Sequence, residues 1–254
     1  MSRKVTSGQD DSITSTIGAC AGRGTGTTWA IIGWFRATDN AGGSDFADIY
    51  FEHENTDDDY LNIQLKTSGV INFFYRPGGF GQPTIDFTTA GSYDDDVWHW
   101  LFFVCRADND FEAFIDGTSV GSSTTSVTNS VTPDLVSVNK NINQSLPVDS
   151  QFAHWINFKT SLSIGEAFAM AYGQWVRHPN MYWELGIGSP EPDWSGEGNA
   201  GTVNGGMVLG DNPPIGPWFG IDRIWQGEKE AVERLEKWFQ QTYPTRHIPA
   251  VVTY

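Results

Sequence analysis

Glu191, Asp193 and Glu197 lie close together in the segment EPDWSGE. Any two of these carboxylates could in principle serve as the pair of acidic groups that a glycoside hydrolase uses. A retaining glycosidase holds two carboxyl groups about 5–5.5 Å apart and raises the pKa of one of them. Pro192 and Gly196 indicate a turn here instead of a regular strand. We therefore predict no catalysis by these carboxylates.

Two acidic triplets offer a different chemistry, the binding of a divalent cation. Residues 57–59 are all aspartate, as are Asp94, Asp95 and Asp96, and each triplet lies in a loop just before a predicted strand. Calcium takes about six to eight oxygen ligands, which loops can supply. Turns favour aspartate without any metal, so a plain turn is the alternative. If calcium is a cofactor, we expect it at Asp94–Asp96, because this triplet adjoins the most apolar strand.

The remaining polar residues indicate no catalytic centre. The five histidines are scattered, at positions 53, 99, 154, 178 and 247, without the spacing of metal ligands. His99, between two tryptophans, is interpreted as a hydrogen-bonded sheet histidine. No serine lies in a nucleophile elbow, and no glycine-rich loop has a phosphate-binding pattern. The sequence therefore predicts a protein that is not an enzyme.

Aromatic residues supply candidate binding surfaces. They make up 14% of the chain, with 11 tryptophans. Tyr93, Trp155, Trp183 and Trp194 lie near predicted turns or strand ends, where an exposed ring can stack on a sugar. Large rings also fill the core of a β-sandwich, so core packing is the alternative for each of them. These four residues are the candidate glycan-binding residues.

The stretch 98–121, WHWLFFVCRADNDFEAFIDGTSVG, organises the predicted fold. Residues 98–106 form a nearly unbroken apolar run, which is typical of a strand buried on both faces. A polar turn separates this run from the strand 111–116, and Asp116-Gly117 is a strong hairpin signal. The stretch thus predicts a three-strand antiparallel meander, and the 28 glycines suit an all-β protein with many turns.

Three segments resemble the concanavalin A-like, or laminin-G-like, jelly roll. They are the meander 98–121, with its F-x-x-F-I-D-G strand; residues 152–173, where Ser161-Leu162-Ser163 and Glu166 open a short helix; and residues 182–214. The last segment is similar to the closing strands of such domains in phage virion proteins. The resemblance covers roughly residues 29–216 and implies a two-sheet antiparallel sandwich. Many such domains bind calcium at one rim.

The sequence divides into three parts. Residues 1–28 are polar and are expected to form an arm, residues 29–216 form the jelly roll, and residues 217–254 form an extension. Within the extension, residues 228–241 have the periodicity of an amphipathic helix. Leu235, Trp238 and Phe239 lie on its apolar face and are the candidate subunit contacts, with packing on its own domain as the alternative.

Charge and targeting signals narrow the function classes. With a formal charge of −16, the chain lacks the excess of basic residues that a nucleic-acid-binding protein needs. No apolar run of about twenty residues predicts a membrane span, and a polar stretch follows the charged start where a signal peptide has its apolar core. Two cysteines, Cys20 and Cys105, do not make a disulfide framework, and one bridge or two free thiols are both open.

These observations favour a non-enzymatic structural protein of a phage virion. It would decorate a capsid or tail, assemble in the host cytoplasm, and have other virion proteins, further copies of itself and host-surface glycans as partners. The alternative is an extracellular polysaccharide-binding module or a polysaccharide-degrading enzyme on the same fold. Neither hypothesis involves nucleic acid or a membrane.

Overall fold

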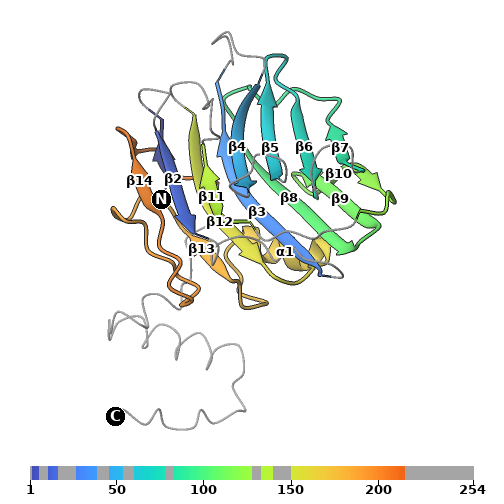
Figure 1. Cartoon of the computed structure of the whole chain (residues 1–254). Helices are drawn as coiled ribbons and strands as arrows, with labels where there is room; N and C mark the ends of the chain where they lie inside the picture. The colour runs from blue at the N-terminus through green and yellow to red at the C-terminus, as the bar shows by residue number, and fades with distance from the viewer. Residues whose placement is uncertain are drawn as a thin grey trace, which may run out of the picture. The chain divides into compact units, whose positions relative to one another are not determined.

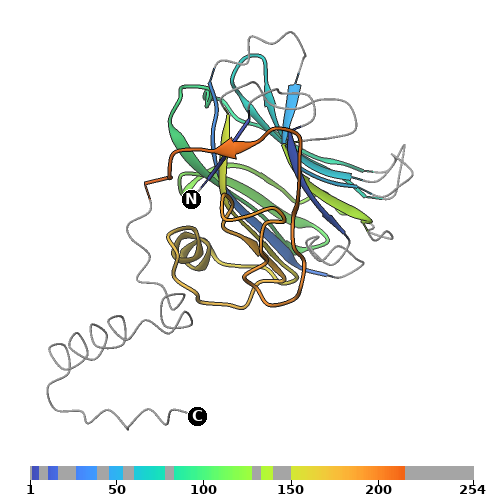
Figure 2. The same cartoon turned by 90° about the vertical axis from the view of Figure 1, so that its left-hand side faces the viewer.

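The structure is a computed structural model in which two antiparallel sheets pack face to face (Figures 1 and 2). It describes residues 2–5, 11–16, 27–38, 46–53, 60–77, 83–127, 133–139 and 150–214. The chain divides into a compact unit, Met1–Ile215, and a second unit, Gly216–Tyr254. The two-sheet jelly roll is confirmed, whereas the predicted helix 228–241 lies outside the described residues.

The eight-stranded sheet, sheet A, has the order β10-β9-β8-β3-β12-β1-β15, and β13 also pairs with β12. Its strands are β1 (Arg3–Lys4), β3 (Trp29–Arg36), β8 (Trp98–Ala107), β9 (Asp110–Ile115), β10 (Thr118–Ser123), β12 (Gln151–Phe158), β13 (Met181–Trp183) and β15 (Val208–Leu209). The consecutive antiparallel pairs β8–β9 and β9–β10 confirm the predicted meander.

The seven-stranded sheet, sheet B, has the order β14-β2-β11-β4-β5-β6-β7. Its strands are β2 (Ser12–Thr16), β4 (Phe46–His53), β5 (Tyr60–Lys66), β6 (Ile71–Arg76), β7 (Ile85–Thr88), β11 (Leu135–Val138) and β14 (Thr202–Asn204). In Figure 2 sheet B faces the right of the view and sheet A the left.

The expectation of a polar arm over residues 1–28 is wrong for the described residues 2–5 and 11–16. Strand β1 pairs with β12 and β15, and β2 pairs with β11 and β14, so both belong to the sandwich. Val5 and Ile13 are completely buried in the core. A strand needs only alternate apolar side chains to bury one face, and backbone pairing supplies the rest.

The inner faces of the two sheets form one apolar core. Trp29 packs edge-on against Phe103, with ring centroids 5.0 Å apart, and Phe103 packs edge-on against Phe73 from sheet B at 5.5 Å. Cys105 lies at the edge of this core with a free thiol, and burial raises its pKa to about 12.

Helix α1 (Ile164–Ala171) covers part of the outer side of sheet A (Figure 2). Ser163 and Glu166 form the predicted capping box at its start. The Trp34 indole donates to the carbonyl of Ala171 at 2.9 Å, and Trp100 packs edge-on against Phe168. Among the described residues, no helix combines the length and apolar character needed to cross a membrane.

Candidate functional site

The outer side of sheet B carries polar and aromatic side chains instead of an apolar layer. Along β5 the alternation sends Leu61, Ile63 and Leu65 into the core and leaves Asn62 and Gln64 on the other side. These two outward amides are nevertheless shielded from solvent. Asn62 is 4% exposed and Gln64 is 8% exposed.

The register of β4, β5, β6 and β7 arranges the outward side chains in three rows. The first row is Phe51, Asn62, Phe74 and Asp86; the second is His53, Tyr60 and Arg76; the third is Asp48, Gln64, Asn72 and Thr88. An irregularity between Asp48 and Tyr50 places both Ile49 and Tyr50 in the core, which keeps Asp48 and Phe51 on the outer side.

Four aromatic side chains of these rows, Phe51, His53, Tyr60 and Phe74, form what we call the ring cluster. Phe51 lies 5.0 Å from His53 and 5.9 Å from Tyr60 between ring centroids. Tyr60 stacks on Phe74 at 5.2 Å, and the guanidinium of Arg76 lies over the Tyr60 ring at 4.4 Å. His53, Tyr60 and Phe74 are partly exposed, so the cluster presents ring surface outward.

The neighbouring row joins amide and carboxyl groups. The Gln64 side-chain amide donates to Asp48 Oδ1 at 3.1 Å, and the Asn72 amide donates to Asp86 Oδ1 at 2.5 Å. Asp48 is completely buried, and this burial raises the pKa of its carboxyl to about 7, against the opposing effect of the Gln64 and Asn62 amides. Asp48 Oδ2 and Asn62 Oδ1 are buried and have no hydrogen-bond donor from the protein.

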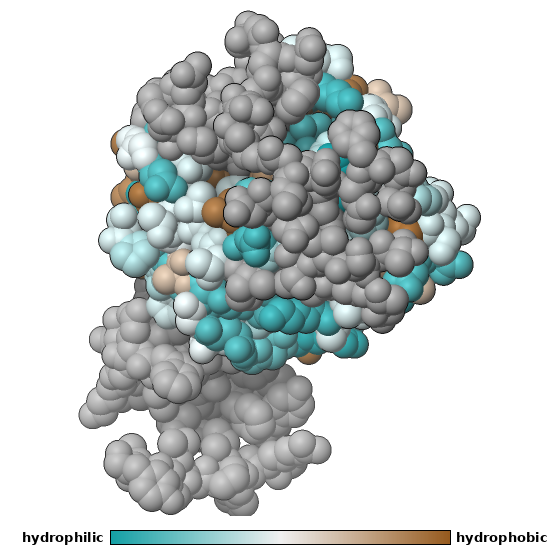
Figure 3. Space-filling model, in the orientation of Figure 1, coloured by the Kyte–Doolittle hydropathy of each residue, from teal (hydrophilic) through white to brown (hydrophobic). Residues whose placement is uncertain are grey.

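Figure 3 shows the molecule in the orientation of Figure 1, from the side to which sheet B presents its outer face. The coloured residues on this side are mostly hydrophilic, with scattered apolar ones. Aromatic rings beside hydrogen-bonding groups suit a ligand with both apolar and hydroxyl surfaces.

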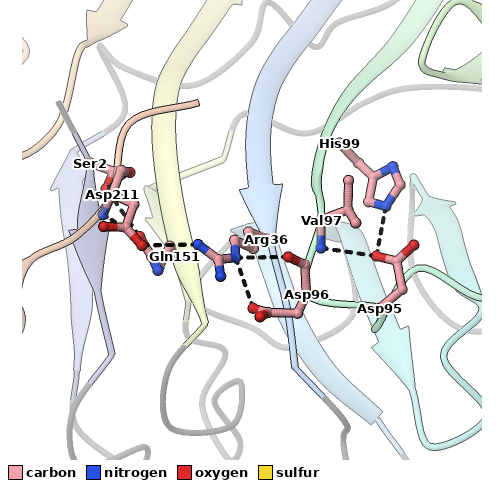
Figure 4. A network of polar contacts seen from close by, with 8 residues as sticks. All are labelled: Ser2, Arg36, Asp95, Asp96, Val97, His99, Gln151 and Asp211. Atoms are coloured by element: carbon pink, nitrogen blue, oxygen red, sulfur yellow. Dashed lines mark hydrogen bonds and ion pairs between the residues drawn. The ribbon is translucent and has the colours of Figure 1, made fainter. Parts of the chain in front are cut away.

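The structure does not bring the second acidic triplet together as a metal site. Asp94 accepts from Ser92 Oγ at 2.6 Å. Asp95 Oδ1 lies 3.1 Å from His99 Nε2, and the Asp96 carboxylate pairs with Arg36 at 2.8 Å (Figure 4). The three carboxylates thus bind three different partners. Within the described ranges, no group of three or more His, Cys, Asp and Glu side chains could hold a metal ion. Residues 57–59 lie outside those ranges.

Asp95 and Asp96 instead belong to a polar network along one end of sheet A. Arg36 Nη1 reaches Asp211 Oδ2 at 3.0 Å, while His99 lies between Asp95 and Asp116, with Nδ1 2.6 Å from Asp116 Oδ2. Burial lowers the pKa of His99, but the hydrogen bonds and charges of Asp116 and Asp95 outweigh it and raise the pKa overall. His99 is a hydrogen-bonded sheet histidine, as the sequence indicates.

Two of the four candidate glycan-binding rings are core residues. Trp155 and Trp183 are completely buried cross-strand partners in β12 and β13, so they cannot stack on a ligand. Strand β12 is buried along its whole length. The position of Trp155 near a predicted turn in the sequence therefore did not indicate that its ring is exposed. Tyr93 is partly exposed but packs edge-on against His99, and Trp194 is partly exposed.

The acidic segment 191–197 is structural. Glu191 is completely buried, pairs with Arg3, and accepts from the backbone amide of Gly186 at 2.8 Å. Asp193 accepts from the backbone amides of Tyr182 and Asn199. These carboxylates hold loops together. The candidate subunit contacts Leu235, Trp238 and Phe239 lie outside the described residues.

The outer side of sheet B was missed by sequence reasoning. Its signal is present in the alternation of Asn62 and Gln64, and of Asn72, Phe74 and Arg76, along two consecutive strands. Sequence alone does not give the cross-strand register, and only the register shows that rings and amides adjoin.

Fold and site together define a two-sheet jelly-roll sandwich with one polar and aromatic outer face. No family model matches the chain, and no curated protein is similar to it. A heptameric SAP-like pentraxin from Limulus polyphemus superposes with a TM-score of 0.55 at 8% identity, covering 85% of this chain and 95% of the pentraxin.

Two further solved structures are similar over part of the chain. Domains LG4-5 of the mouse laminin alpha1 chain give a TM-score of 0.48 at 13% identity, covering 65% of this chain and 43% of that one. The CBM40 domain of a Ruminococcus gnavus sialidase, solved with bound alpha2,3 sialyllactose, gives 0.44 at 12% identity, covering 58% and 84%. The chain thus spans less than half of the laminin fragment. It has the concanavalin A-like jelly-roll fold, and likeness at these identities indicates fold alone.

Proposed function

We propose that the protein is a non-catalytic glycan-binding module whose site is the outer side of sheet B. The observation that carries this proposal is the ring cluster, in which Tyr60 and Phe74 are partly exposed, beside the exposed carboxyl of Asp86, the cross-strand partner of Phe74. Sugars present C–H surfaces that pack on rings and hydroxyl groups that bind amides and carboxylates. Both kinds of group lie here on neighbouring strands of one rigid sheet.

The spacing of carboxyl groups on this face argues for binding without hydrolysis. Asp48 lies on β4 and Asp86 on β7, with β5 and β6 between them. Three strand spacings of about 4.8 Å separate the two strands by roughly 14 Å. Glycosidases hold their carboxyl pair at about 5–5.5 Å for retention or 6.5–9.5 Å for inversion. This pair is too far apart for either mechanism.

Affinity electrophoresis of the full chain tests the proposal, with laminarin and xylan as neutral probes and alginate as an acidic one. We expect a neutral polysaccharide to retard the protein. The double variant Tyr60→Ala/Phe74→Ala should weaken retardation about tenfold, since each ring contact contributes about 0.5–1.5 kcal/mol. Phe168→Ala is the matched control, because Phe168 is an exposed ring on α1, which packs on sheet A.

Two results would contradict the proposal. One is migration unaffected by every polysaccharide, and the other is equal retardation of the wild type and the double ring variant. Release of soluble sugar from laminarin, xylan or alginate would contradict the non-catalytic part alone.

A more specific proposal is that the protein is a structural component of a phage virion. Its support is the resemblance of residues 182–214 to virion jelly rolls and the predicted amphipathic helix 228–241. A virion protein that binds glycans would contact the host surface. Mass spectrometry of purified particles tests this role, and absence of the chain from them would remove it while leaving glycan binding intact.

A further inference from the structure

We propose that three side chains on strands β6 and β7, those of Phe74, Asp86 and Thr88, form a subsite for two neighbouring hydroxyl groups of a neutral sugar. We call these three residues the β6–β7 subsite. The inference rests on the proposed glycan-binding function. It names the class of ligand that the outer side of sheet B selects, which is neutral sugars in preference to acidic ones.

All three side chains of the β6–β7 subsite can be reached from outside the protein. Along β7 the alternation buries Ile85 and Phe87 in the core. Asp86 and Thr88 point the other way and are exposed. Phe74 is the cross-strand partner of Asp86 and is partly exposed. Because such partners have Cβ atoms about 4.5–5.5 Å apart, a ligand lying against the Phe74 ring also reaches the Asp86 carboxylate.

A buried amide fixes the polar half of the subsite, Asp86 and Thr88. Asn72 is 3% exposed, and its side-chain Nδ2 donates to Asp86 Oδ1 at 2.5 Å and to Thr88 Oγ1 at 3.1 Å. A third bond, to the carbonyl of Phe87 at 3.2 Å, anchors the amide to the backbone. Since both side-chain oxygens bond the same nitrogen, they are held beside each other before a ligand arrives. Such preorganisation lowers the ordering cost of binding.

The polar half offers one open acceptor and one open donor. Within the described part of the chain, Asp86 bonds only Asn72, which leaves its Oδ2 without a protein donor. The Thr88 hydroxyl accepts from the same amide and donates its own proton to no described residue. A sugar hydroxyl both donates and accepts, so two neighbouring hydroxyl groups satisfy both positions. The C–H surface of the same sugar can then pack on the Phe74 ring.

The charge of Asp86 selects against acidic ligands. A uronic acid or sulfated sugar brings a group that only accepts hydrogen bonds, so this group cannot donate to Asp86 Oδ2. At close range it is also repelled by the carboxylate. The formal charge of −16 on the whole chain acts in the same direction. A neutral sugar meets neither obstacle.

The test is affinity electrophoresis of the full chain, with laminarin and xylan as neutral probes and alginate as the acidic probe. Wild type should bind a neutral probe more tightly than alginate. Asp86→Asn exchanges a charge-assisted hydrogen bond for a neutral one, so neutral binding should weaken about tenfold while alginate binding does not weaken. Thr88→Val removes the donor and keeps the shape of the side chain, so neutral binding should weaken about fivefold.

Asp110→Asn is the matched control. The Asp110 side chain is 51% exposed and lies on β9 of sheet A, so this variant makes the same change of charge away from the subsite. It should bind every probe within about twofold of the wild type, since distant exposed charges are largely screened by salt. Thermal melting should show that all three variants are folded, because each replaces an exposed or half-exposed side chain.

The outcomes separate the two proposals. Unchanged neutral binding in either Asp86→Asn or Thr88→Val, with loss in Tyr60→Ala/Phe74→Ala, would overturn the subsite and leave the glycan-binding function standing. Equal weakening in Asp110→Asn and Asp86→Asn would do the same, since the effect would then be one of net charge. A wild-type preference for alginate would also overturn the subsite alone. No binding of any probe, or equal binding by the wild type and the double ring variant, would overturn the glycan-binding site and the subsite with it.

Discussion

Replacing Asp48 with asparagine should stabilise the protein at neutral and alkaline pH. The pKa of Asp48 rises from 3.8 to about 7 on folding because burial disfavours the carboxylate. The folded state therefore binds this proton more tightly than the unfolded state does. Stability is highest below the unfolded pKa, falls as pH rises through the folded pKa, and the loss is complete above the folded pKa.

The size of the effect follows from the two pKa values. They differ by about three, and each unit corresponds to 1.36 kcal/mol, so ionised Asp48 costs roughly 4 kcal/mol above pH 7. Between about pH 4.5 and about pH 8 the wild type should lose about 3 kcal/mol more unfolding free energy than Asp48→Asn. The variant should therefore be more stable than the wild type at pH 8.

Urea unfolding of both proteins at the two pH values measures this difference. Asp86→Asn is the control, since Asp86 is exposed on the same sheet face. Other groups that titrate in this range, His99 among them, are common to all three proteins and cancel in the comparison. Parallel pH dependence of wild type and Asp48→Asn would refute the claim that Asp48 is desolvated in the folded state.

Four further predictions concern other parts of the chain. The pKa of His99, followed by NMR, should lie above its ordinary value and fall in Asp116→Asn; an unchanged titration would contradict the ion pair. Glu191→Gln should lower unfolding free energy by about 3 kcal/mol, since it breaks a buried ion pair; a loss under 1 kcal/mol would show that the pair is dispensable. Calcium should not raise the melting temperature through residues 94–96, and a rise abolished by replacing their carboxylates would show that they bind it. Deleting residues 226–254 should leave the unit Met1–Ile215 folded and release monomers from any oligomer, and sedimentation decides this.

Much of the fold could be predicted because local pattern and turn chemistry agree. The apolar run from Trp98 and the Asp116-Gly117 turn specify consecutive antiparallel strands, and these are β8, β9 and β10. The capping box of α1 could likewise be predicted from the sequence, since it depends on two residues three positions apart. Features encoded within about twenty residues were thus accessible from sequence.

Features that depend on the pairing of strands far apart in the chain could not be predicted from the sequence. Strands β1 and β2 look like a polar arm, because their burial depends on β12, β15, β11 and β14, all far away in the chain. Trp155 and Trp183 lie near strand ends in sequence, yet their pairing places both in the core. Composition alone does not distinguish an exposed ring from a buried one.

The two sides of the sandwich indicate why the candidate site lies on sheet B. On the outer side of sheet A, α1 packs against Trp34 and Trp100, so rings there contribute to the stability of the fold. On the outer side of sheet B, Asp48 is buried without a charged partner and lowers stability above its folded pKa. An apolar residue at this position would fold at least as well. The free-energy cost of this buried carboxyl is measurable as the pH-dependent difference in stability between the wild type and Asp48→Asn.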